Sequence, residues 1–210
     1  MRRLYTTWKF DWGKVITLSL ILGVLAGLIQ EVGYLQDTSF SDFFIATEWL
    51  IFIGLLLASS RDSAILSFFK IIIFEILMEL VKWGLHCPAV GWKAAQEELK
   101  QSYLRILLFI VIIALLTCIA LLPNMLGALT LTFLNLILFI RCIQYLFPAE
   151  NGEKVHFVSA AFGLFVLITS LFGITDKRNE KIVAVTLVVV LGATYYILYQ
   201  LLNIKLFLFI

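Results

Sequence analysis

The chain has 210 residues, of which 62% are hydrophobic and 14% charged, and its formal net charge is +2. A mean hydropathy of +1.02 is too high for a water-soluble domain, in which about half of the residues are apolar. The composition indicates an all-α, polytopic protein of the plasma or inner membrane. It leaves no room for a separate soluble catalytic domain, because six spans alone use about 120 residues. The small net charge gives no argument for nucleic acid as a partner.

Apolar runs of span-like length follow one another along the chain and predict a single helical bundle surrounded by the lipid bilayer. We expect spans at residues 15–35, 43–60, 106–122, 125–140, 157–174 and 182–202. A further apolar run, at residues 64–85, contains several charged side chains. Whether that run crosses the membrane decides between six spans and seven.

The distribution of lysine and arginine favours six spans. If residues 64–85 cross, eight bases lie on one side of the membrane and seven on the other, with Lys70 inside a span. If the whole segment 61–105 stays on one side, that side has thirteen bases and the other has three. Because cytoplasmic loops are rich in Lys and Arg, the second arrangement predicts that both termini and segment 61–105 are cytoplasmic.

Segment 61–105 also holds the most informative polar residues. On a helix, Glu75, Glu79, Lys82 and His86 fall within an arc of about 60°, a polar stripe three turns long. So narrow a stripe favours a helix packed against protein or beside a wet cavity, whereas the base count favours an interfacial helix on the cytoplasmic side. A crossing helix requires that Glu79 and Lys82 neutralise each other, or that Glu75 is protonated.

A second helix is expected after Pro88, which should end the first one. It runs from about residue 92 into the span at 106–122, and its total length of about 45 Å exceeds the hydrocarbon core. Its first turns should therefore project into the cytoplasm. Together with the polar stripe, this projecting helix is the expected docking surface for a soluble protein partner.

Two smaller patterns lie in the first part of the chain. Ser19, Gly23 and Gly27 recur at every fourth residue, which predicts close helix packing, either within the chain or between copies in a homo-oligomer. The acids Glu31, Asp37, Asp42 and Glu48 cluster at the outer end of the first two spans with no base between them. They form either a mouth that attracts cations or an ordinary outer loop that lacks Lys and Arg.

No residue pattern in the chain predicts a catalytic centre, a metal site or a cofactor. Cys87, Cys118 and Cys142 show no CxxC spacing, and the two histidines are far apart in sequence. The leading hypothesis is a non-enzymatic membrane subunit that self-associates or docks a partner, as transporter subunits, immunity proteins and membrane sensors of defence systems do. A small channel or carrier with a path lined by Glu75, Glu79 and Lys82 is the second, and an intramembrane enzyme is the third.

Overall fold

A computed structural model describes residues 10–32, 47–60, 62–122, 124–147, 155–173 and 178–202, and these residues form seven α-helices. The helices are α1 (Trp12–Glu31), α3 (Thr47–Ala58), α4 (Ala64–Val90), α5 (Trp92–Ala120), α6 (Met125–Leu146), α7 (Phe157–Gly173) and α8 (Arg178–Leu202). The expected helical class is confirmed for this part of the chain.

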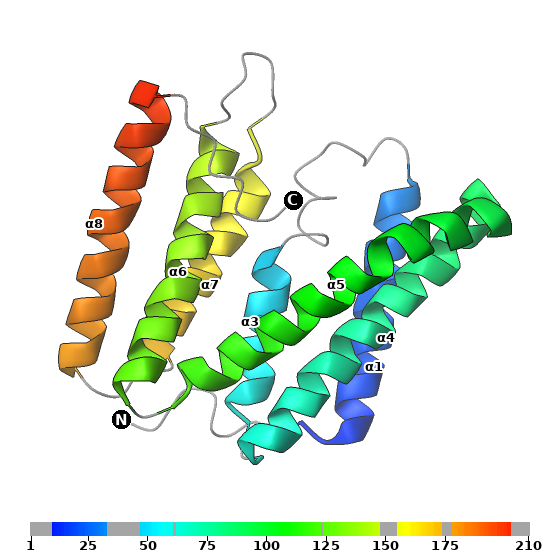
Figure 1. Ribbon diagram of the computed structural model, residues 1–210, viewed down its shortest axis with the longest axis horizontal. Coiled ribbons are helices and arrows are strands. Elements are labelled where there is room, and N and C mark those ends of the chain that lie inside the picture. Colours follow the sequence, from blue (N-terminus) through cyan, green and yellow to red (C-terminus); the bar gives the residue numbers. More distant parts are fainter. Residues whose placement is uncertain are drawn as a thin grey trace.

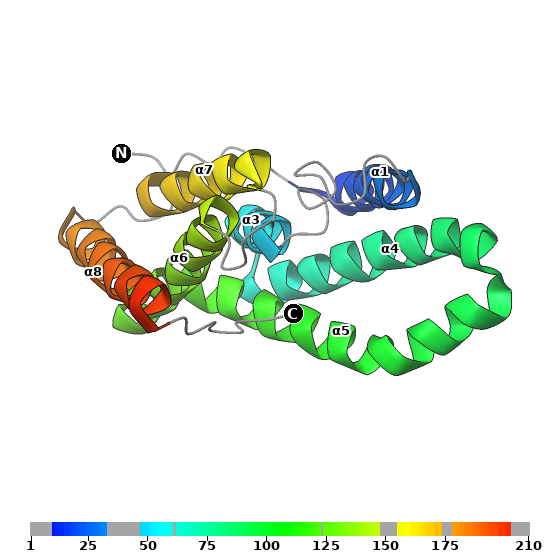
Figure 2. The same cartoon turned by 90° about the horizontal axis from the view of Figure 1, so that it is seen from above.

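Successive helices alternate in direction, so that the chain runs up and down through the bundle (Figure 1). Helix α3 contacts α4, α5 and α7, and α6 lies between α5, α7 and α8. Seen from above, α4 and α5 diverge and then meet again at a tip that projects from the rest of the bundle (Figure 2). A largely apolar core cluster joins α3, α5, α6 and α7 around Ile51, Ile113, Leu134 and Val166.

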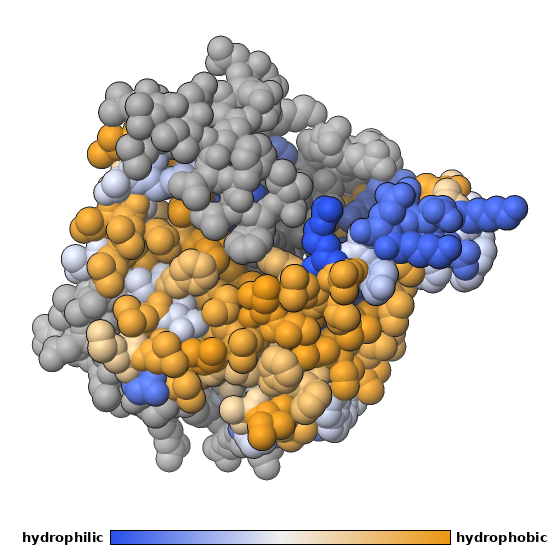
Figure 3. Space-filling model, viewed as in Figure 1, coloured by the Kyte–Doolittle hydropathy of each residue, from blue (hydrophilic) through white to orange (hydrophobic). Residues whose placement is uncertain are grey.

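The surface of the bundle is strongly apolar. Large hydrophobic side chains are exposed along α1, α5, α6, α7 and α8, among them Leu28, Leu108, Leu129, Ile168 and Val190. On the face shown in Figure 3, hydrophobic residues form a broad apolar surface, while hydrophilic residues gather at the projecting tip. A water-soluble monomer rarely exposes so large an apolar area. Helices α1, α5 and α6 are long and apolar enough to cross a membrane, which indicates a membrane protein.

Helix α4 continues further than the sequence suggests. Pro88 lies inside it, and the helix ends at Val90, followed by Gly91, where φ is +87°. Proline removes one backbone donor and strains the preceding turn. Because Pro88 falls in the last turn, few backbone hydrogen bonds of the helix are affected. The N–H of Gly91 still donates to the carbonyl of Cys87 at 2.9 Å. Gly91 tolerates the left-handed conformation and lets α5 start at once.

Helices α1 and α4 run side by side in the same direction. A Cβ atom on Gly23 would lie 2.9 Å from the Met78 carbonyl oxygen, and one on Gly27 would lie 3.3 Å from Cα of Lys82. The two backbones therefore approach closely where α1 has no side chains. The structure places this small-residue face against α4 of the same chain, and Ser19, one turn earlier, is also fully buried.

Candidate functional site

Helix α4 carries ionisable side chains over most of its length. The Nζ atom of Lys82 lies 2.7 Å from Oε1 of Glu79, three residues earlier; 11% of the Lys82 side chain and 31% of the Glu79 side chain are exposed. This contact is the neutralising pair that a crossing helix requires. Pairing offsets part of the cost of placing two charges beside apolar helices.

Glu75 lies one turn further along the stripe and differs from its neighbours. Its side chain is 1% exposed, and neither carboxylate oxygen has a hydrogen-bond partner among the described residues. Ile71 and Met78, one turn away on either side, are buried as well. An isolated carboxylate is very costly in such surroundings, so the site favours the uncharged, protonated carboxyl group.

His86 completes the stripe and links three helices. Its Nδ1 atom lies 2.7 Å from Oε1 of Glu31 at the end of α1, and its Nε2 atom lies 3.1 Å from Oε2 of Glu98 on α5. The carboxylates of Glu31 and Glu98 both favour the charged, doubly protonated form of the His86 ring. Both ring nitrogens are thus used by carboxylates, and the ring is not available to the neighbouring Cys87.

Glu79, Lys82 and His86 line a pocket of about 850 Å³ between α1, α4 and α5, whereas Glu75 is not among its lining residues. Glu31, Glu98, Lys82 and His86 lie at its polar end. Its other end is lined by apolar side chains of α4 and α5: Ile76, Leu80, Ile106, Leu107 and Ile110. The pocket is therefore amphipathic along the helix axes.

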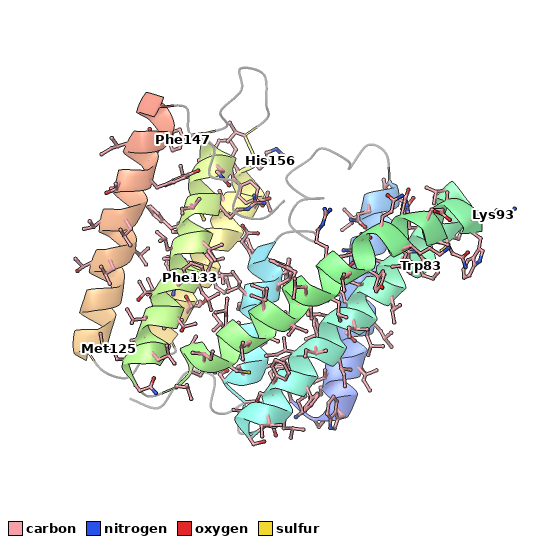
Figure 4. All side chains as sticks on the ribbon, viewed as in Figure 1. Trp83, Lys93, Met125, Phe133, Phe147 and His156 are labelled. Atoms are coloured by element: carbon pink, nitrogen blue, oxygen red, sulfur yellow. The ribbon has the colours of Figure 1, made fainter. Side chains whose placement is uncertain are left out.

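The tip beyond the pocket is held together by aromatic contacts. The indole nitrogen of Trp83 donates to the carbonyl of Ala95 at 3.0 Å, and the rings of Trp83 and Trp92 are 5.2 Å apart. Figure 4 shows Trp83 where α4 and α5 meet and Lys93 at the far end of the tip. The tip exposes charged residues, including Lys93 and the pair formed by Glu97 and Lys100.

A second ionic contact lies at the opposite end of α4. The Nζ atom of Lys70 is 2.5 Å from Oδ2 of Asp62 and 2.5 Å from the carbonyl oxygen of Phe10. Only 4% of the Lys70 side chain is exposed, and its ammonium group lies over the ring of Trp12 at 5.7 Å. Asp62 was not singled out in the sequence, because its partner is eight residues away across a helix start.

The structure separates the members of the expected acidic cluster that it describes. Glu31 contacts His86, whereas Glu48 is buried on α3 with Oε1 3.7 Å from Nε of Arg141 on α6. Asp37 and Asp42 lie outside the described residues. Glu31 and Glu48 therefore contact different bases, and the expected acidic mouth stays a prediction. Arg141 was overlooked because the sequence suggests that the span ends at residue 140, whereas α6 continues to Leu146.

In the described ranges, no three Asp, Glu, His or Cys side chains are arranged to hold a metal ion. The three cysteines are free thiols. No family model, no curated protein and no solved structure matches this chain. The candidate site therefore has to be interpreted from its own chemistry.

Proposed function

We propose that this chain is a seven-span membrane carrier in which α4 crosses the bilayer and provides a path for protons. The support for the crossing is the register of α4 against α1. The carbonyl of Phe10 accepts a hydrogen bond from Lys70, Gly23 packs against the backbone of Met78, and Glu31 contacts His86. Residues 70–86, about 24 Å of helix, thus accompany the whole of α1, which is itself long and apolar enough to span. If α1 crosses, this part of α4 lies at the same depth.

The support for a proton path is the spacing of ionisable groups along that stretch. Glu75, Glu79, Lys82 and His86 succeed one another at each turn, from a fully buried position to the polar end of the pocket. Each ionised group near the centre of a span costs about 2.5–3.5 kcal/mol on insertion scales. Sequences that keep such groups inside a span generally use them, and chains of Glu and His are typical proton relays.

Glu75 is the residue that carries this proposal, because it is buried, has no partner in the described part of the chain and lies at the inner end of the series. We expect purified protein in liposomes to admit protons when a potassium diffusion potential drives them, reported by an internal pH-sensitive dye. Glu75→Gln keeps the shape of a protonated glutamate but cannot release a proton. It should reduce the flux to that of protein-free liposomes.

The matched control is Glu97→Gln, which removes an acid from the exposed part of α5, where Glu97 pairs only with Lys100 in the described residues. This variant should conduct like the unmodified protein. Equal flux in Glu75→Gln and the unmodified protein would contradict a role for Glu75. Flux no greater than the lipid background in the unmodified protein would contradict the proton path.

A second candidate function, docking of a soluble partner, is favoured by the polar tip of α4 and α5. The tip projects from the bundle, is stiffened by the contacts of Trp83, and exposes Lys93, Glu97 and Lys100. The small-residue face of α1, by contrast, is used inside the chain, which removes the main argument for self-association through it. Replacing the three charged residues by alanine should abolish co-purification of a partner without changing proton flux.

A further inference from the structure

The contact of His86 with two carboxylates depends on its protonation state. An imidazolium ion donates from both ring nitrogens, while a neutral ring donates from one and presents a lone pair at the other. Only the charged ring therefore satisfies Glu31 and Glu98 together. Of the two contacts, the one to Glu98 is longer, at 3.1 Å against 2.7 Å, and the Glu98 side chain is 61% exposed against 27% for Glu31. The neutral ring should keep its hydrogen bond with Glu31 and lose the one with Glu98.

Loss of that contact changes the pocket in a defined way. Glu98 is the first residue of α5 that lines the pocket, and the wall continues from it to Ile110. On the other side of Glu98, α5 stays attached to α4 through Trp83, Ala95 and the joint at Gly91. Release of Glu98 therefore allows the wall to move while the tip stays joined.

We propose that His86 is a proton-dependent latch, which holds α5 against α4 and α1 at the polar end of the pocket and opens the pocket when it loses its proton. The latch controls access to the same pocket that the proposed carrier function uses. It concerns helix positions, however, and the proposal holds or fails whether or not protons are transported.

The other charged groups around the pocket do not replace the latch. On α4, Lys82 is paired with Glu79; on α5, Tyr103 lines the same wall; and α1 contributes Glu31. The pocket thus has three carboxylates and one lysine besides His86, and a neutral ring leaves the carboxylates without enough positive charge. Because the two carboxylates bind the charged ring, the closed state is complete at low pH and is lost as the pH rises and the ring loses its proton.

The test is a distance measurement between α1 and α5 as a function of pH. Spin labels are placed at Ile21→Cys and Gln101→Cys, both exposed positions, after Cys87, Cys118 and Cys142 have been changed to serine. Double electron–electron resonance should show a short distance at low pH and a longer one at high pH. The change with pH should follow the titration curve of a single group. His86→Gln should give the long distance at every pH, whereas His156→Gln, which changes the other histidine, should titrate like the parent.

A second variant keeps the test informative if His86→Gln is poorly folded. Glu98→Gln retains His86 and Glu31 but weakens the bond to α5, so its transition should move to lower pH. A parent distance that does not change with pH would overturn the latch, and so would a transition that survives in His86→Gln. Absence of proton flux in liposomes would count against the carrier function without altering these distances.

Discussion

Replacing Asp62 by asparagine should lower the free energy of unfolding by about 3 kcal/mol, the lower end of the range for breaking a buried ion pair. Lys70 is 3% exposed and pairs with Asp62 at 2.5 Å. Without the Asp62 carboxylate, its ammonium group has no carboxylate within 4 Å among the described residues and keeps the carbonyl of Phe10 and the ring of Trp12. The cost lies in the lysine left behind, because a buried charge without its counterion is poorly solvated.

Two controls separate this cause from a general effect of losing an acid. Chemical unfolding in detergent micelles should show that Asp62→Asn combined with Lys70→Met is much closer to the unmodified protein than Asp62→Asn alone. Glu97→Gln breaks an ion pair whose side chains are 70% and 69% exposed, and it should cost less than about 1 kcal/mol. If the double variant is no more stable than Asp62→Asn, the buried charge is not the reason.

Gly23→Leu should also destabilise the protein, by about 1–3 kcal/mol or more. At this position even a Cβ atom would lie 2.9 Å from the backbone oxygen of Met78 and 2.9 Å from Cβ of Val81, both of which are fixed to the α4 backbone. Helices α1 and α4 would have to separate along their contact. Since Gly27 and the contact of Glu31 with His86 lie further along the same pair of helices, the polar end of the pocket should loosen too.

Gly84→Leu is the matched control for this prediction. Gly84 is also a helical glycine, but a Cβ atom there would meet nothing within 4 Å. Thermal unfolding in detergent should therefore show a lower midpoint for Gly23→Leu and a midpoint for Gly84→Leu that is unchanged or higher, because glycine is a poor helix former. Equal losses in the two variants would mean that the close approach of α1 and α4 is not what the first substitution disrupts.

The sequence predicts the local features of this protein well. Apolar runs locate most helix ends to within a few residues, although α6 continues to Leu146, past the expected end at residue 140. The three-residue spacing of Glu79 and Lys82 is enough to predict their contact, because such neighbours share a helix face. Gly23 and Gly27 predict a close packing surface. Their partner helix does not follow from the spacing, since any helix with a suitable groove can fill it.

The long-range features of the candidate site required the structure. Glu31 is 55 residues from His86, and Glu98 reaches His86 only because the chain reverses at Gly91. Neither distance in sequence nor helix periodicity contains that information. For the number of spans, the sequence and the packing point to different answers. The distribution of bases favours a cytoplasmic position for residues 61–105, whereas the packing of residues 70–86 along α1 favours a crossing helix.

The most direct test of the account is the sidedness of the two ends of α4. Single cysteines are introduced at Ser63, just before α4, and at Lys93, just after it, in protein whose three native cysteines have been replaced by serine. A membrane-impermeant maleimide is then applied to sealed right-side-out and inverted vesicles. If α4 crosses the bilayer, the two positions react from opposite sides of the membrane, which is the result we expect. Reaction of both from the same side would show that α4 does not cross, and would contradict the proposed path through the bilayer.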